Sequence, residues 1–294
     1  MHLFSFFQRK PQPLPFWEPT PTTSRMLGNR RFRTDLPYIL PKDDVENSRL
    51  NYQHYAFKIL LKSNHLAPIR VSHGDILDVG CGTAIWMLEM AREFPQARLV
   101  GLDTEFALPH GPVASNCRFI QGDIFRGLPF KEESFDYTHQ RLMVLAVPRQ
   151  RWPFVLSELV RVTRRDGWIE LVEAGDNFSN SGPLMRNVLT WIRNILRPRG
   201  IDASAIGQIG TWLQGAGARN VQCYSVRCPL GKQGGHAGNL LSKDILACIA
   251  ALRPHFINQL GLYPNVVDKT LAGLLYEWEN YQTAEELFLA YGQK

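Results

Sequence analysis

The sequence predicts an α/β fold, a mostly parallel sheet with helices on both faces, and two observations carry this prediction. Short apolar runs that are typical of buried strands alternate with helical segments between residues 76 and 172. A strand–helix–strand unit crosses over the sheet, so such alternation makes successive strands parallel. The second observation is a glycine turn, Gly80-Cys81-Gly82, which joins the first strand to the first helix.

The apolar runs place seven strands along the chain. They are expected at 76–79, 99–102, 117–120, 135–138, 168–172, 221–226 and 287–291. Ala84, Met87, Leu88 and Ala91 have the spacing of one helical face, and Pro95 closes that helix. Further helices are expected at 152–162, 183–196, 203–214, 240–260 and 266–281.

The N-terminal region differs in composition from the rest. Five prolines between residues 11 and 21 predict an extended or flexible arm over 1–40. Asp43 or Asp44 then caps a helix over 45–62, within a cap segment at 41–70. We expect the ligand-binding core at 71–175, and substrate-shaping helices and the final strands of the same domain at 176–294.

Bulk composition limits the classes of function. The 294 residues are 45% hydrophobic and 20% charged, as in ordinary globular proteins, and the net charge of +6 is spread along the chain. We therefore expect no nucleic-acid partner. The five cysteines form no C-x-x-C pair, which favours a reduced, cytoplasmic setting and no bound metal. No apolar run approaches the roughly 18 residues of a membrane span, and no signal peptide is recognisable.

The glycine turn predicts a site for a nucleotide-like ligand, because bare backbone allows a ligand to approach closely. A dinucleotide fingerprint would need a third glycine at position 85, where Ile85 stands. The pattern D-x-G-x-G-x-G, beginning at Asp78 and with Ala84 in its last position, fits S-adenosylmethionine better. The alternative is a tight turn with a purely structural role.

Three acids follow successive strands at the edge where such ligands bind. Asp78 is placed to bind the ammonium of a methionine moiety, Asp103 the ribose hydroxyls, and Asp123 the exocyclic amine of adenine. The cofactor-binding residues expected from the sequence are Asp78, Gly80, Cys81, Gly82, Asp103, Thr104, Gly122, Asp123, Ile124 and His139.

These segments resemble class I methyltransferases, and more narrowly the LaeA-like group and its bacterial relatives, including the teleocidin C-methyltransferase/cyclase. The resemblance covers residues 38–172 and includes 65–69, 82–86, 135–141 and 167–171, and the ending 290–294 is also similar. It implies a Rossmann-like, seven-stranded sheet with its last strand antiparallel and a helical cap. Two positions depart from the pattern: Ala84 replaces a glycine, and Arg165-Asp166-Gly167 replaces Pro-Gly-Gly.

Candidate catalytic groups follow from their places along the chain. His139, just past the fourth strand, is the first choice for a base or orienting group, and Glu173 after the fifth strand is the second. Tyr52 on the N-terminal helix is a third. For each of them a structural role is the alternative.

The leading hypothesis that the resemblance implies is methyl transfer to a small molecule. The expected acceptor is a secondary metabolite, with or without a prenyl group. Carbon methylation coupled to cyclisation is preferred over transfer to oxygen or nitrogen. A nucleic-acid methyltransferase is disfavoured because His139-Gln140-Arg141-Leu142 stands where base-modifying enzymes carry Asn/Asp-Pro-Pro-Tyr. A LaeA-like regulator that works through partners, and a nicotinamide-dependent oxidoreductase, are the remaining alternatives. The N-terminal arm is where a homo-oligomer could form.

Overall fold

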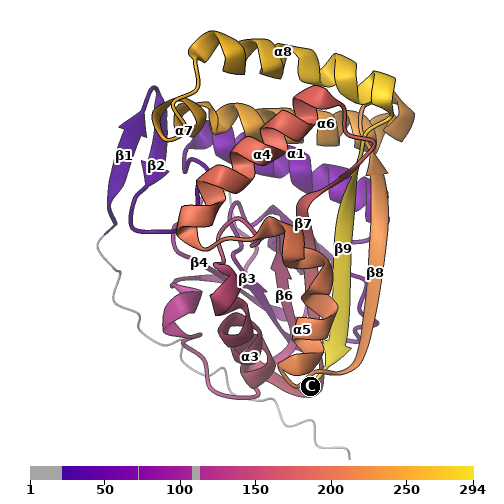
Figure 1. Ribbon diagram of the computed structural model, residues 1–294. Helices are drawn as coiled ribbons and strands as arrows, with labels where there is room; N and C mark the ends of the chain where they lie inside the picture. Colours follow the sequence, from indigo (N-terminus) through magenta and orange to yellow (C-terminus); the bar gives the residue numbers. More distant parts are fainter. Residues whose placement is uncertain (1–21, 72, 108–112) are drawn as a thin grey trace, which may run out of the picture.

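A seven-stranded sheet forms the centre of the computed structural model, which describes residues 22–71, 73–107 and 113–294 (Figure 1). Its order is β5-β4-β3-β6-β7-β9-β8. The strands are β3 (Asp75–Val79), β4 (Arg98–Asp103), β5 (Cys117–Gln121), β6 (Phe135–Arg141), β7 (Thr163–Ser179), β8 (Arg219–Pro229) and β9 (Ala284–Gln293). The first five are parallel, and β9 is antiparallel to both of its neighbours. The predicted fold class and antiparallel last strand are confirmed.

Burial explains why the central strands read as continuous apolar runs. Every residue of β3 is buried, because helices cover both faces of the sheet. The α2 helix (Ile85–Glu93) packs with β3 and β4 residues in one core cluster. On the other face, α3 (Trp152–Val162) and α5 (Ile209–Gly215) belong to a second, larger cluster.

A cap of helices lies beyond one end of the sheet (Figure 1). It contains α1 (Asp44–Leu61), α4 (Pro183–Leu196), α6 (Gly235–Ala251), α7 (Arg253–Asn258) and α8 (Pro264–Tyr281). The α1 helix packs on α6, which packs in turn on α8. Asp43 is the N-cap residue of α1, and its side chain accepts a hydrogen bond from the Glu46 amide at 3.0 Å.

Two predicted helices are divided in the structure. The segment expected as one helix over 240–260 forms α6 and α7, because Pro254 stands in the first turn of α7 and cannot continue a preceding helix. The segment at 203–214 begins as a 3₁₀ helix, Ala203–Gln208, before α5. The sequence period alone did not reveal either division.

The strands β7 and β9 are longer than predicted. The strand expected at 168–172 extends over Thr163–Ser179, so the expected boundary after residue 175 lies inside it. Its far end pairs with the start of β9, where Phe178 lies opposite Glu285. Both strands therefore reach from the sheet into the cap, as Figure 1 shows.

The N-terminal segment contains a hairpin where an extended or flexible arm was expected. Its strands are β1 (Ser24–Leu27) and β2 (Arg30–Arg33). Arg31 and Arg33 both form ion pairs with Glu105, just after β4, and so hold the hairpin against the sheet. Residues 1–21 of the expected arm, with the oligomer contact proposed for it, lie outside the described residues.

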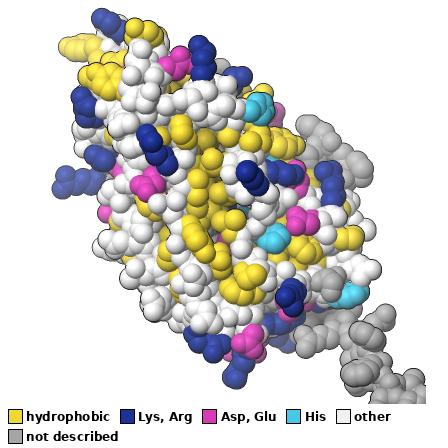
Figure 2. Space-filling view, turned by 90° about the vertical axis from the view of Figure 1, so that its right-hand side faces the viewer, with side chains coloured by type: hydrophobic (Ala, Val, Ile, Leu, Met, Phe, Trp, Pro, Cys, Tyr) yellow, Lys and Arg dark blue, Asp and Glu magenta, His cyan; other side chains and the backbone are white. Residues whose placement is uncertain are grey.

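The strand β8 is one of the two edge strands of the sheet. Most of its residues are exposed, among them Tyr224. Figure 2 views the molecule from the right-hand side of Figure 1 and shows a band of hydrophobic side chains bordered by Lys and Arg side chains. In the part of the chain that the structure describes, no helix is long and apolar enough to cross a membrane.

Candidate functional site

The turn after β3 has the bare backbone that the sequence predicted. Gly80 and Gly82 have φ angles of +74° and +52°, which are left-handed values that favour glycine. The amides of Gly80 and Cys81 donate to the Leu102 carbonyl at 2.7 and 3.1 Å, which ties the turn to β4. A Cβ added at Gly80 would lie 2.5 Å from the Met143 sulfur. A side chain at position 80 would therefore clash with Met143, whereas a Cβ added at Gly82 would meet nothing nearer than 3.7 Å, so the backbone at Gly82 borders an open space.

That space is a cavity of about 250 Å³ between the carboxyl ends of the strands and the helical cap. All ten residues that the sequence assigned to the cofactor line it. They are Asp78, Gly80, Cys81, Gly82, Asp103, Thr104, Gly122, Asp123, Ile124 and His139. Parallel strands place their carboxyl ends at one edge, and the register sets Asp78 beside both Gly101 of β4 and His139 of β6.

Asp103 is buried, but its carboxylate is paired with donors from the protein. Its carboxylate accepts the Gly82 amide at 2.9 Å and the Glu105 amide at 3.1 Å, and Lys42 lies 3.3 Å away. Burial alone would raise the pKa of Asp103, but Lys42 and the two amides outweigh it and hold the pKa below its usual range. The group is therefore a carboxylate at neutral pH, as an acceptor of hydroxyl hydrogen bonds must be.

Asp123 has a similar place after β5. Its side chain accepts the Phe125 amide at 2.9 Å and caps the short 3₁₀ helix Ile124–Arg126. Ile124 and Phe125 line the cavity beside it. This leaves an apolar surface and a carboxylate together at the β5 end of the site.

The structure places His139 against Asp78 and Trp86. Its ring is only 1% exposed, its Nδ1 lies 2.8 Å from the Asp78 carboxylate, and it stacks on Trp86 at 3.8 Å between ring centroids. A histidine clamped in this way orients Asp78. The ring lines the cavity, and its Nδ1 and one of its faces are already occupied by Asp78 and Trp86.

Glu173 and Tyr52 are not among the residues that line the cavity. The Glu173 side chain is fully buried and accepts the amides of Met143 and Val144, each at 3.0 Å. It therefore fixes the loop after β6. Burial raises the pKa of Glu173 to about 8, against the opposing effect of those two amides. Tyr52 is 52% exposed on the outer side of α1 and does not line the cavity.

Ala84 does not crowd the site. It has a left-handed φ of +59°, which explains why a glycine suits this position, and its methyl group is buried with Trp86, Met87 and Met90. The cavity is lined by its neighbours Thr83 and Ile85. The alanine in place of glycine at position 84 therefore changes the packing of the core and the local backbone, and its methyl group does not reach the cavity.

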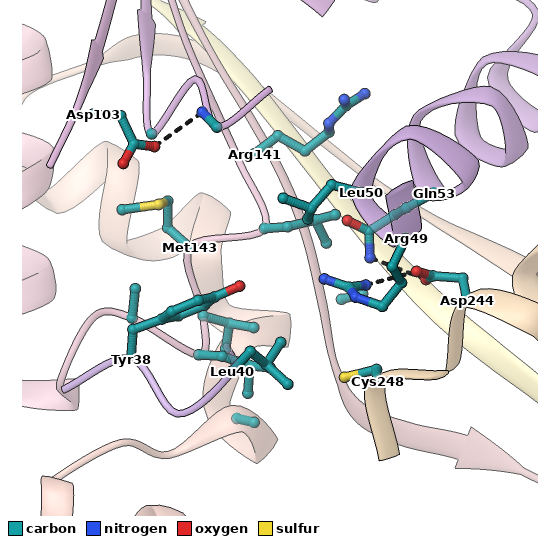
Figure 3. Close-up of a pocket in the computed structure, with 18 of the residues that line it drawn as sticks. Tyr38, Leu40, Arg49, Leu50, Gln53, Asp103, Arg141, Met143, Asp244 and Cys248 are labelled. Carbon is teal, nitrogen blue, oxygen red and sulfur yellow. Dashed lines mark hydrogen bonds and ion pairs between the residues drawn. The ribbon is translucent and has the colours of Figure 1, made fainter. Parts of the chain in front are cut away.

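The cap supplies cavity residues that sequence reasoning missed. On one side of the cavity Figure 3 shows Asp103 and Met143, and on the other Arg49, Asp244 and Cys248. Arg49 pairs with Asp244 at 2.6 Å, and Gln53 donates to the same carboxylate at 3.0 Å. Asp176 and Glu285 line the cap end as well. No local pattern marks these residues, since 195 positions separate Arg49 from Asp244.

Metal ligands are not grouped in the described part of the chain. Within residues 22–71, 73–107 and 113–294, no set of three or more His, Cys, Asp or Glu side chains could hold a metal ion.

Comparison with known proteins identifies the domain that contains this site. A family model described as a methyltransferase domain matches residues 76–167. The chain is 32% identical over 134 residues to methyltransferase str3 of Strobilurus tenacellus, which covers 45% of this chain and 47% of that protein. It is 34% identical over 140 residues to the secondary metabolism regulator laeA of Aspergillus fumisynnematus, covering 46% of this chain and 36% of that protein.

A solved structure shares the fold. A putative methyltransferase from an antibiotic biosynthesis pathway of Anabaena variabilis superposes with a TM-score of 0.54 at 14% identity, over 82% of this chain and 96% of that chain. The chain thus carries a methyltransferase domain in a Rossmann-like methyltransferase fold. It spans about half or less of the length of the two curated relatives named above.

Proposed function

We propose that this chain, which carries a methyltransferase domain, transfers a methyl group from S-adenosylmethionine to a small-molecule acceptor. The observation that supports this most is the convergence of the glycine turn and three strand-end acids on one cavity. Relatives named as methyltransferases and as a regulator of secondary metabolism favour a secondary metabolite as the acceptor.

The residues of the site fit the cofactor. Gly82 leaves its backbone open to the cavity and donates its amide to Asp103, so the turn and the β4 carboxylate are already fixed to each other. Asp103 would accept the ribose hydroxyls, with Lys42 moving aside from the carboxylate. Asp78, held by His139, would bind the methionine ammonium, and Asp123 the adenine amine.

S-adenosylmethionine, when bound, supplies a methyl group already activated on a sulfonium. The chain therefore has to bind, orient and exclude water. Met143 and Leu142 line the cavity from the loop that Glu173 fixes, between the cofactor residues and the cap. A base is needed only where the nucleophile carries a proton.

The apolar cap half of the cavity is the proposed acceptor site. Met185, Leu189 and Ile192 of α4 line it together with Ile245 and Ile249 of α6. Such walls bind an apolar body through the hydrophobic effect. The resemblance to the teleocidin group extends the proposal to methylation at carbon coupled to cyclisation, with oxygen and nitrogen as alternatives.

A regulatory role is a second candidate, favoured by the 34% identity to the laeA regulator. The two functions differ in their products. A regulator binds S-adenosylmethionine but methylates no small molecule, whereas the enzyme releases a product that is one methyl group heavier.

Calorimetric titration with S-adenosylmethionine tests the cofactor step. We expect one site per chain. Asp103→Ala should weaken binding by about 1–3 kcal/mol, because charged hydrogen bonds are lost. Asp268→Asn is the matched control, since Asp268 pairs with Arg253 on the exposed surface of α8. No binding to the wild-type chain would refute the proposal.

Incubation with S-adenosylmethionine labelled in its methyl group and a set of apolar metabolites then tests transfer. Mass spectrometry of the products gives the acceptor, and nuclear magnetic resonance gives the methylated atom. Labelled small molecules support the enzyme; bound cofactor with label in no small molecule supports the regulator instead.

A further inference from the structure

The cap end of the cavity contains a carboxyl group that the proposed reaction does not use. Glu285 begins the cavity-lining part of β9 and is only 7% exposed. Among the described residues, none donates a hydrogen bond or forms an ion pair with its side chain. A carboxyl group buried without a partner is costly, so such a group commonly has a ligand-binding or catalytic role.

A second acid lies at the same end. Asp176, in the irregular part of β7 beside the start of β9, is 6% exposed and also lines the cavity. Arg193 of α4 pairs with one of its oxygens, and the other oxygen, Oδ1, is buried with no partner. The two strands β7 and β9 thus bring two carboxyl groups with unpaired oxygens to the cap.

The third acid at this end is already satisfied. Asp244 accepts from Arg49 at 2.6 Å and from Gln53 at 3.0 Å, and Arg49 also pairs with Glu46. Arg49 is therefore held by two acids and is not available to neutralise Glu285. The cap end of the cavity therefore contains more acidic groups than cations to pair with them, and apolar walls surround it.

We propose that Glu285 binds a protonated amine of the methyl acceptor, whose apolar body lies between α4 and α6, and that Asp176, which lines the same cavity, adds negative charge. This inference rests on the proposed function and names the class of acceptor: an apolar molecule with a basic nitrogen at the end remote from the cofactor. An acceptor that carries a carboxylate at that end is disfavoured, because Glu285 offers it no cation and could not ionise beside it. Glu285 is a specificity residue in this assignment, since it lies in the cap and not at the glycine turn.

The groups around Glu285 determine how binding depends on protons. Burial, and then the nearby charge of Asp244, raise the pKa of Glu285 to about 8. Cys248 of α6 and Cys228 of β8 also face it, and burial raises the pKa of each thiol to about 12, so both stay neutral. At pH 7 Glu285 is therefore mostly protonated. When an ammonium group binds, it favours the ionised form of Glu285, and the proton of the Glu285 carboxyl group is released to the solvent.

Three probes of equal length test the assignment: octylamine, octanol and octanoate. Each is titrated by calorimetry at pH 7 into the full chain saturated with S-adenosylhomocysteine. We expect octylamine to bind about tenfold more tightly than octanoate, and octanol to lie between them, since charge-assisted hydrogen bonds are the stronger ones. Titration in two buffers of different ionisation enthalpy should show net proton release with octylamine alone.

Glu285→Gln keeps the shape of the side chain and removes its charge. It should lose most of the preference for octylamine and the proton release, while octanol affinity stays within about twofold. Glu286→Gln is the matched control, because Glu286 is the next residue of β9 and does not line the cavity. Asp176→Asn should weaken octylamine binding to a smaller extent, since Arg193 already holds its other oxygen.

Equal binding of the three probes to the wild-type chain would overturn the assignment. So would an equal loss of the preference for octylamine in Glu285→Gln and Glu286→Gln. Binding of S-adenosylhomocysteine is measured first for every variant. If the wild-type chain does not bind S-adenosylhomocysteine, the proposed function is refuted. If it binds S-adenosylhomocysteine but shows no preference for octylamine, this inference alone is refuted.

Discussion

At the scale of single residues, the pair formed by Asp78 and His139 shows how neighbouring strands position a ligand-binding group. The parallel register sets the two residues side by side on β3 and β6, and the imidazole bonds the carboxylate at 2.8 Å. Trp86 stacks on the ring and fixes its plane. The histidine therefore fixes the orientation of the Asp78 carboxylate at the cavity.

His139→Ala should thus weaken S-adenosylmethionine binding by about tenfold, because a buried carboxylate loses its partner. Calorimetry measures the affinity, and thermal unfolding checks that the variant is folded. His236→Ala on the exposed start of α6 is the control. Full cofactor affinity combined with lost methyl transfer would instead restore the catalytic role that its place in the sequence suggested.

At the scale of elements, one buried ion pair joins two helices that are distant in sequence. Arg49 of α1 and Asp244 of α6 meet at 2.6 Å with both side chains buried. Helix propensity has no part in this contact. The contact exists because α1 packs on α6 in the cap, beside the cavity.

Arg49→Met should lower the free energy of unfolding by about 3–5 kcal/mol, because it leaves Asp244 and Glu46 as buried charges without their partner. Unfolding in denaturant measures the loss. Arg253→Met is the matched control: it breaks the exposed pair with Asp268 between α7 and α8 and should change stability little. Similar losses in both variants would contradict the structural role given to the buried pair.

At the scale of the whole molecule, buried titrating groups make stability depend on pH. The pKa of Glu173 and of Glu285 is about 8 in the folded chain, against an ordinary value of 4.5. Between these values the folded state keeps protons that the unfolded state has released, so stability falls as pH rises. His54 acts oppositely: burial lowers its pKa from 6.5 to about 4, so its contribution is lost as pH falls through that range.

We therefore expect the free energy of unfolding to decrease between about pH 6.5 and 8, where the two carboxyl groups dominate. Denaturant unfolding at pH 6.5, 7.25 and 8 measures the slope. The double variant Glu173→Gln, Glu285→Gln should flatten it. A slope that the double variant leaves unchanged would show that other groups control stability in this range.

Much of the cofactor half of the site was predictable because its residues lie close together along the chain. Strand ends and the glycine turn are local patterns, and parallel strands necessarily place their carboxyl ends at one edge. Asp78, Asp103 and Asp123 could therefore be located before any contact was known, and they line one cavity. The α/β class followed in the same way, whereas the antiparallel last strand was implied by the family resemblance.

The sequence by itself determined the alternating strands, the left-handed glycine turn and the row of acids, because each depends on a short stretch of residues. Only the tertiary structure decided that His139 is clamped by Asp78 and Trp86, that Glu173 holds a loop, and that Tyr52 faces outward. It also decided that β7 and β9 extend far enough to bring Asp176 and Glu285 into the cap. The partners of buried groups come from segments far apart in the chain, as the 195 positions between Arg49 and Asp244 show, and no local pattern records them.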